Sequence, residues 1–144
     1  MLLISHRGNL YGPEPSRENH PTYIKEALAS RFDVEIDVWR VNDAWVLGHD
    51  EPTYEIDGSF LKNEFLWCHA KNLNALYEMM NMNVHCFWHQ EDDFTLTSKG
   101  YIWTYPGNLL TSKSICVMPD DMQNVYQTSD KISGICSDFI GRYQ

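Results

Sequence analysis

The sequence is poor in positive charge. It has 11 Lys and Arg residues against 20 Asp and Glu residues, and its formal net charge is −9 over 144 residues. Phosphate backbones and anionic lipid headgroups are bound through clusters of basic side chains. The charge balance therefore argues against a nucleic-acid partner and against docking on membranes through a polybasic segment.

Long apolar runs and paired cysteine motifs are also missing. No stretch approaches the roughly 20 apolar residues of a membrane-spanning helix, and Met1–Ile4 is followed at once by polar residues. We therefore expect no signal peptide, no membrane insertion and a cytoplasmic protein. None of the four cysteines forms a Cys-x-x-Cys pair, which argues against a zinc ribbon or redox motif. With no linker or repeat visible, we expect residues 1–144 to form a single domain.

The stretch Phe32–Val38 alternates between apolar and acidic residues. Because strand side chains point to opposite faces in turn, Asp33, Glu35 and Asp37 share one face and the apolar residues share the other. Three neighbouring acids repel one another, and a hard cation bound by their oxygens would offset that cost. A half-exposed strand with a solvated acidic face is the alternative interpretation.

Two histidines follow short apolar runs that are typical of buried strands. Leu2–Ile4 leads into Ser5-His6-Arg7-Gly8, and Ala44–Leu47 leads into Gly48-His49-Asp50. A histidine beside a glycine, just beyond a strand, lies where a loop opens into a site. Because imidazole titrates near neutrality, one histidine of such a pair can accept a proton while the other donates one.

In this order and spacing, the motifs resemble the N-terminal signature of the glycerophosphodiester phosphodiesterases, a family of phospholipase-C-like phosphodiesterases built on a TIM barrel. The resemblance covers residues 1 to about 55. Two later segments, Trp103-Thr104 and Gly134–Asp138, are similar to a strand end and to the last strand of that family. The matching motifs near the N-terminus are His6-Arg7-Gly8, Glu18-Asn19, Glu35-Ile36-Asp37 and His49-Asp50.

The resemblance implies a role for each matching residue. His6 and His49 would be the general acid and base, without any indication of which is which. Arg7 would contact the phosphate, which suits the planar fork of donors in a guanidinium. Glu35 and Asp37 would be metal ligands. The implied reaction is hydrolysis of a phosphodiester, most simply a small glycerophosphodiester of lipid metabolism.

One position departs from the family pattern. The family's third metal ligand is a glutamate two residues before a lysine, and in Trp67–Lys71 the glutamate position holds His69 while Lys71 matches as a substrate contact. Strand parity points His69 toward the expected site. The resemblance implies one divalent cation, Mg²⁺ or Ca²⁺, held by Glu35, Asp37 and His69, whereas the imidazole favours Mn²⁺ or Zn²⁺. Alternatively, His69 contacts the substrate and the cation is weakly bound or absent.

The chain is shorter than an ordinary TIM barrel, which needs about 250 residues. We expect an α/β protein with a reduced or truncated barrel of about eight short parallel strands, from which several outer helices are missing. Helices are expected at 21–30, 73–82 and 120–127, and loops at 51–64 and 90–100. The strands are expected near residues 2–5, 32–38, 44–48, 65–70, 84–89, 101–104, 114–118 and 134–137.

A barrel without its outer helices would leave strand surfaces exposed. The chain is rich in aromatic residues, with five Trp, eight Tyr and six Phe, and exposed apolar patches mark interfaces. We therefore expect a homo-oligomer, most simply a dimer.

Several further polar residues have two possible roles. His85 and His89 share a strand face; we expect His85 to be a core residue, whereas His89, at the strand end, is either a site residue or a core residue. Asn19 is expected to order the site loop or to cap the helix that follows, and His20 to cap that helix. Asp50 is expected to orient the neighbouring histidine or to close the turn.

The sequence therefore predicts a metal-dependent phosphodiesterase. A binding module for a phosphorylated ligand is the main alternative, since the missing glutamate and missing helices would suit it. A structural subunit completed by a partner chain is a third possibility. The two histidines favour the enzyme, because binding alone does not require both.

Overall fold

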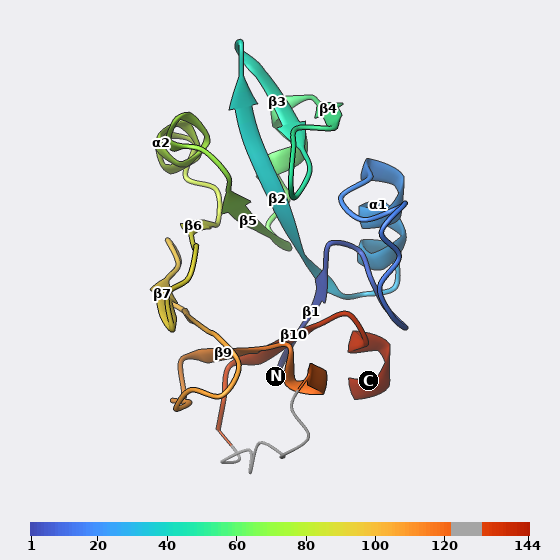
Figure 1. Ribbon diagram of the computed structural model, residues 1–144, viewed down its shortest axis with the longest axis vertical. Helices are drawn as coiled ribbons and strands as arrows, with labels where there is room; N and C mark the ends of the chain where they lie inside the picture. Colours follow the sequence, from blue (N-terminus) through green and yellow to red (C-terminus); the bar gives the residue numbers. More distant parts are fainter. Residues whose placement is uncertain (122–130) are drawn as a thin grey trace.

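The computed structural model describes residues 1–121 and 131–144. All ten strands in these residues belong to one curled sheet, and two α-helices lie outside it (Figure 1). The helices are α1 (Pro21–Ala29) and α2 (Leu73–Asn81), with short 3₁₀-helices η1 (Gly58–Lys62), η2 (Pro119–Asp121) and η3 (Ile140–Tyr143). The strands are β1 (Leu2–His6), β2 (Asp33–Val41), β3 (Ala44–Leu47), β4 (Tyr54–Ile56), β5 (Leu66–Ala70), β6 (Cys86–Trp88), β7 (Phe94–Leu96), β8 (Ile102–Thr104), β9 (Ser114–Val117) and β10 (Gly134–Ser137).

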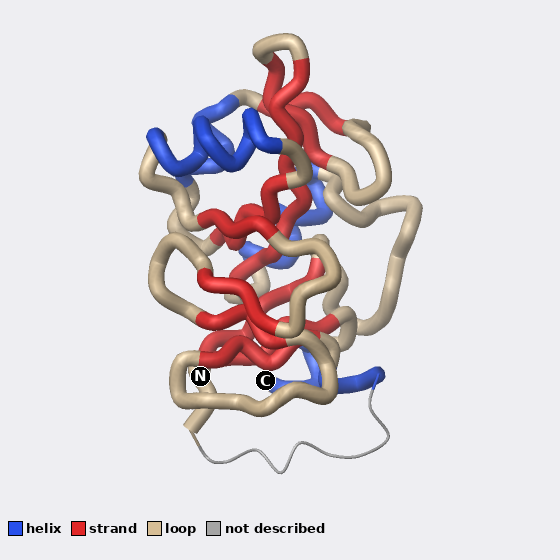
Figure 2. Tube along the Cα trace, turned by 60° about the vertical axis from the view of Figure 1, so that its left-hand side comes forward, coloured by secondary structure: helices blue, strands red, loops and turns tan. Residues whose placement is uncertain are grey.

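Seven strands of the described chain are parallel, in the spatial order β6-β5-β2-β1-β10-β9-β8. The other three pair antiparallel: β3 with β2, β4 with β3, and β7 with β8. Figure 2 shows the strands following one another as a curled stack. At the far end of the curl, Ser98 N donates to Cys86 O at 2.8 Å and Thr95 Oγ1 donates to Trp88 O at 2.7 Å. These bonds hold the segment that contains β7 against β6.

The expectation of eight parallel strands is wrong at 44–48. There β3 runs back along β2, with Ala44 opposite Val41, through the two-residue turn Asn42-Asp43. Both turn residues have positive φ, 49° and 62°, as a tight hairpin turn requires. A parallel crossover needs about a dozen residues or more. The fold is therefore a mixed α/β sheet with few helices, and a TIM barrel is not confirmed.

The two connections expected to be loops contain short elements, so this expectation is also wrong. β4 and η1 lie within 51–64, and β7 lies within 90–100. Strands of three residues carry little periodicity of their own and form because a neighbouring strand offers hydrogen bonds. The helices expected at 21–30 and 73–82 are confirmed as α1 and α2, whereas the one expected at 120–127 lies outside the described residues beyond Asp121.

Both α-helices begin at side-chain caps. His20 Nδ1 accepts from Thr22 N at the start of α1, as expected, and Asn72 Oδ1 accepts from Ala75 N at the start of α2. The two helices pack on the outer face of the sheet, where Val34, Ile36 and Val38 of β2 are fully buried. The alternation expected in β2 is thereby confirmed, and its acidic residues face the inside of the curl.

A second apolar cluster fills the inside of the curl, below the acidic residues. It contains two of the five tryptophans and is built from six different strands: Ile4, Trp67, Phe87, Trp103, Ile115, Val117 and Cys136. All four cysteines are buried. In residues 1–121 and 131–144, no helix combines the length and the apolar character that crossing a membrane would take.

Candidate metal and phosphate site

The expected site residues gather round one pocket at the carboxyl ends of the parallel strands. The pocket has a volume of about 400 Å³, within the usual range for small-molecule sites. Asp37 makes ion-pair contacts with four of the residues that line it. The expected residues that line the pocket are His6, Arg7, Glu35, His49, His69 and Lys71.

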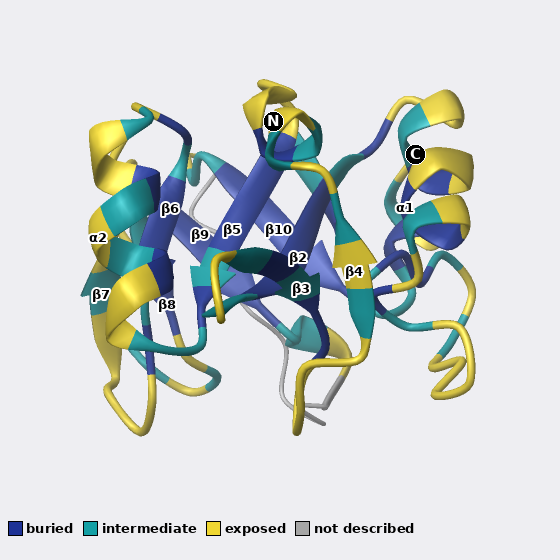
Figure 3. Cartoon of the chain, turned by 90° about the horizontal axis from the view of Figure 1, so that it is seen from above, coloured by how far each residue is buried: buried dark blue, intermediate teal, exposed yellow. Residues whose placement is uncertain are grey.

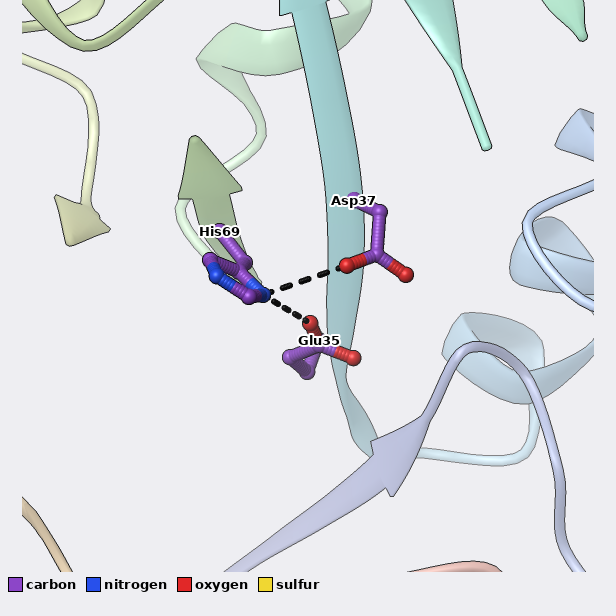
Figure 4. Close-up of side chains that lie close together, drawn as sticks. All are labelled: Glu35, Asp37 and His69. Atoms are coloured by element: carbon purple, nitrogen blue, oxygen red, sulfur yellow. Dashed lines mark ion pairs between the residues drawn. The ribbon is translucent and has the colours of Figure 1, made fainter. Parts of the chain in front are cut away.

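Glu35, Asp37 and His69 form a group of the size that holds a cation. One potential ligand atom from each lies within 4.8 Å of the others. His69 Nδ1 is 3.1 Å from Asp37 Oδ1 and 3.7 Å from Glu35 Oε1, and Figure 4 shows the imidazole pointing between the two carboxylates. The arrangement follows from the sheet, because β5 pairs in parallel with β2 and sets His69 opposite Asp37.

The backbone holds the other nitrogen of His69. Nε2 lies 2.9 Å from the carbonyl oxygen of His89, and since a carbonyl only accepts, Nε2 is the donor. In the neutral ring Nδ1 then carries the lone pair, which faces two carboxylates. A lone pair facing negative oxygens is repelled unless a positive charge lies between them. Metal-binding histidines are commonly anchored through their second nitrogen in this way.

The two carboxylates are buried and incompletely hydrogen-bonded. Glu35 Oε2 and Asp37 Oδ1 have no hydrogen-bond partner in the described part of the chain. Burial and the charge of Asp37 raise the pKa of Glu35 well above its ordinary value, against the effect of Arg7. Burial also acts to raise the pKa of Asp37, but the neighbouring imidazoles of His49 and His69 and the charge of Arg7 outweigh it and hold this pKa well below its ordinary value.

The second oxygen of Asp37 is fixed by Asn19 and Arg7. Asn19 Nδ2 donates to Asp37 Oδ2 at 2.8 Å, and Asn19 Oδ1 accepts from Asp37 N at 2.9 Å. Arg7 Nε lies 3.0 Å from the same oxygen. Of the two roles expected for Asn19, the structure shows the first, since it binds the loop to β2 while His20 caps α1. Asp37 Oδ1 is left facing the pocket and His69.

His6 is oriented by a carboxylate to which the sequence analysis gave no role. His6 Nδ1 lies 2.8 Å from Asp138 Oδ1, and Asn9 Nδ2 donates to the same oxygen at 2.7 Å. Burial acts to raise the pKa of Asp138, but the hydrogen bond and charge of His6 outweigh it and lower this pKa. The ionised Asp138 only accepts, so Nδ1 of His6 donates, and its Nε2 is 3.8 Å from Glu35 Oε2. The signal for Asp138 was its place directly after the last strand.

Arg7 connects the second histidine to the acids. Arg7 Nη2 lies 2.6 Å from His49 Nδ1, and since a guanidinium only donates, Nδ1 accepts and neutral His49 carries its proton on Nε2. Arg7 Nη1 donates to Glu18 Oε2 at 3.3 Å. Burial acts to lower the pKa of Arg7, but the negative charges of Asp37, Glu35 and Glu18 outweigh it and raise this pKa. Arg7 is therefore a fixed positive charge at the edge of the pocket.

His89, for which two roles were open, lies in the pocket. The residue is 9% exposed, and its ring packs against Tyr105 at a tilt, with 4.7 Å between centroids. Neither ring nitrogen has a hydrogen-bond partner among the described residues. Burial and the nearby His69 lower its pKa, so the ring is neutral. Lys71 lines the same pocket, with Nζ 4.0 Å from Asp37 Oδ1.

The remaining polar candidates lie away from the cation group. His85 makes structural contacts, since Nε2 bonds Thr97 Oγ1 at 2.8 Å and the ring packs on Trp67, but the residue is half-buried and not in the core as expected. Asp50 Oδ1 is 3.6 Å from His49 Nε2, too far for a hydrogen bond, and its side chain is almost fully exposed.

Comparison with known proteins identifies no relative of this chain. No protein-family model matches it, and neither does any curated protein or solved structure. The resemblance to the glycerophosphodiester phosphodiesterases therefore rests on the motifs of the sequence alone, and what the site does is argued from its geometry.

Proposed function

We propose that the protein hydrolyses a phosphodiester with the help of one divalent cation held by Glu35, Asp37 and His69. The observation that supports the proposal is that two buried oxygens of this group, Glu35 Oε2 and Asp37 Oδ1, lack hydrogen-bond partners in the described residues. His69 Nδ1 lies 3.1 Å from Asp37 Oδ1 and 3.7 Å from the other oxygen of Glu35, Oε1. Buried charges are costly unless they are paired or bind a metal. A bound cation would supply the partner, and it would polarise a phosphate oxygen as a Lewis acid.

The donor set also bears on which cation is bound. Two carboxylates and one imidazole form a less negative and softer site than three carboxylates. Such a set favours Mn²⁺ or Zn²⁺ over Mg²⁺ or Ca²⁺. The anchored Nε2 of His69 supports a ligand role for Nδ1, because the ring cannot turn without losing its bond to the backbone.

In this proposal His6 is the general base. Asp138 holds the Nδ1 proton, so the lone pair of Nε2 is free to accept the proton of an attacking water or substrate hydroxyl. The carboxylate of Asp138 also stabilises the imidazolium that forms. The bond to Nδ1 leaves Nε2, on the side of Glu35, as the nitrogen that accepts the proton.

His49 takes the opposite role and protonates the leaving alkoxide from Nε2. As an acid, His49 carries protons on both nitrogens. The proton on Nδ1 points to Asp37 Oδ2, which lies 3.5 Å from Nδ1 and pairs with the charged ring. Arg7, which now bonds Nδ1, turns to the phosphate together with Lys71. Their positive charges offset the negative charge that develops on the phosphate oxygens.

The size of the pocket supports a small substrate. A volume of about 400 Å³ accommodates a compact diester such as a glycerophosphodiester. One part of the pocket wall is apolar and aromatic, and it would contact the carbon atoms of the alcohol groups. The residues of that wall are Trp103, Tyr105, Pro106, Val117 and Met118.

A metal-dependent hydrolysis assay tests the proposal. An aryl phosphodiester and a panel of glycerophosphodiesters are offered with Mg²⁺, Ca²⁺, Mn²⁺ or Zn²⁺. We expect turnover that is lost in chelator and that falls by about 100-fold or more in His6→Ala. His20→Asn is the matched control, because His20 lies outside the pocket and asparagine preserves its cap. A fully active His6→Ala variant would falsify the proposal, and binding of a phosphate ester without turnover would favour the binding module.

A further inference from the structure

We propose that a second copy of this chain binds against the outer face of α2 and the neighbouring strand β7. The surface in question, called here the α2–β7 patch, consists of large apolar side chains that are between 49% and 73% exposed. Its residues are Leu73, Tyr77 and Met80 from α2 and Phe94 and Leu96 from β7.

The helix α2 is apolar on two sides. Ala75 and Met79 are fully buried against the sheet, whereas Leu73, Tyr77 and Met80 form an exposed stripe at the spacing i, i+4, i+7. A helix on the surface of a monomer normally turns polar residues to solvent, and one that is apolar all round is normally packed on both sides. The exposed stripe therefore marks α2 as a helix that lacks its second neighbour.

The stripe continues into a groove. A cavity of about 390 Å³ lies between α2 and the strands β6 and β7, and Met80 and Leu96 of the patch both line it, together with Leu76 and Trp88. Figure 3 shows α2 exposed on its outward side. The two parts of the patch thus meet at a hollow that is lined by Met80 and Leu96.

The patch is large enough to form most of a dimer interface. At about 200 Å² for a large side chain, the exposed fractions of its five residues amount to about 600 Å². A stable interface of standard size buries about 800 Å² on each partner, including a polar rim. Isolated apolar patches on monomers are usually smaller or functional.

The charge of the patch favours a second copy as the occupant. The one charged residue of α2 is Glu78, which is neutralised by Arg40 with Nε 2.9 Å from Oε2, and β7 has none. Two copies of a chain of net charge −9 repel each other over most of their surface. The patch itself has no unpaired charge, and the exposed acidic run of residues 91–93 lies at its edge, just before β7. Because neither element contains lysine or arginine, an anionic membrane is a poor occupant.

The stripe is also self-complementary. A two-fold interface sets the same patch of both copies face to face. With two α2 helices antiparallel and the axis near Tyr77, Leu73 of one copy meets Met80 of the partner subunit. The two Tyr77 side chains then meet at the axis.

Size-exclusion chromatography with light scattering, run on the full chain at micromolar concentration, tests the proposal. We expect a dimer, and a dissociation constant raised by about 30-fold or more in Tyr77→Glu, as for loss of a central contact. Tyr11→Glu is the matched control, because Tyr11 is 73% exposed outside the patch, and it should leave the dimer intact. A monomeric wild-type protein overturns the proposal, as does a dimer that persists in both Tyr77→Glu and Leu96→Glu.

Cross-linking supplies a second measurement, in which a covalent bond traps the associated pair. Since the four native cysteines are buried, a new surface thiol is the reactive one under mild oxidation. We expect Tyr77→Cys to form an intermolecular disulfide across the two-fold axis and Tyr11→Cys to form none. Equal yields from the two variants would contradict the proposed interface. Neither measurement depends on catalysis, so the result is independent of the proposed function.

Discussion

His6 and Asp138 are 132 residues apart in the sequence, yet His6 Nδ1 donates to Asp138 Oδ1 at 2.8 Å. They meet because β1 and β10 are parallel neighbours, with Ser5 opposite Ser137, and each of the two residues comes at the end of its strand. The contact determines which nitrogen of His6 faces the pocket.

Asp138→Asn removes the charge behind His6 and leaves the shape of the side chain. We expect kcat/KM for the phosphodiester to fall by about 10²- to 10⁴-fold, mostly through kcat, because the imidazolium loses its stabilising carboxylate. The measurement is the pH profile of kcat/KM for both proteins. Asp50→Asn is the control, since Asp50 is exposed and makes no hydrogen bond to His49. Similar losses in both variants would argue against a specific role for Asp138.

Glu35→Gln separates metal binding from stability. The neutral amide removes a buried charge with an unpartnered oxygen, so we expect the metal-free protein to unfold with a free energy equal to or about 1–2 kcal/mol above that of the wild type. The rise in Tm that the wild type shows with excess Mn²⁺ should disappear. Thermal melts with and without Mn²⁺ measure both effects, with the exposed Glu64→Gln as control. A metal-dependent rise that persists in Glu35→Gln would exclude this site.

The acidic strand could be predicted because its pattern is local. Alternation with a period of two puts Glu35 and Asp37 on the face opposite Ile36 whatever the rest of the chain does, and the same parity placed His69 correctly. The hairpin was missed although Asn42-Asp43 is a turn signal, because the similarity to a barrel family favoured a parallel strand. Both turn residues have positive φ values, as the Asn-Asp pair of a two-residue hairpin turn predicts.

Other parts of the structure depend on contacts between distant segments. β7 forms because Phe94 lies opposite Thr104 on β8, and three residues carry too little pattern to reveal this in advance. Similarly, Asp138 becomes part of the site only through the pairing of β10 with β1. No local pattern contains that pairing, so the motif around Asp138 suggested a strand but no role.

His85 makes the stability of the fold depend on pH. Burial lowers its pKa from 6.5 to about 4, so the folded protein keeps the ring neutral while the unfolded chain binds a proton below pH 6.5. The contribution of the neutral His85 ring to the free energy of unfolding is complete above pH 6.5 and is lost as the pH falls toward 4. We expect a loss on the order of 1–2 kcal/mol, reduced for partial exposure of the ring. Urea unfolding at pH 7 and pH 5 gives the free energy of unfolding at each pH. The difference between the two values should be smaller for His85→Gln than for the wild type, and equal differences would contradict the assignment.

Gly48 holds the loop that presents His49. Its φ is +153°, and a Cβ atom at this position would lie 2.0 Å from the carbonyl oxygen of Glu51. Since the oxygen belongs to the backbone and the position of Cβ is fixed by the backbone of residue 48, the clash cannot be relieved by a side-chain rotation. We expect Gly48→Ala to lower the free energy of unfolding by about 2 kcal/mol or more and to reduce activity, as measured by urea unfolding and the hydrolysis assay. Gly100→Ala is the control for strain alone, because its φ is +86° and nothing lies within 4 Å of its Cβ position.

His89 combines an apparent defect in packing with a place in the pocket. A buried ring whose two nitrogens lack partners destabilises the fold. His89→Phe keeps the ring contact with Tyr105 and should therefore raise the free energy of unfolding by about 1–2 kcal/mol. The carbonyl that anchors His69 belongs to the backbone and is retained. If the ring bonds a hydroxyl of the substrate, KM should rise by about tenfold while kcat changes little. Greater stability with an unchanged KM would show that His89 only fills space, whereas a gain in stability together with the loss in KM would mark the defect as a cost of substrate recognition.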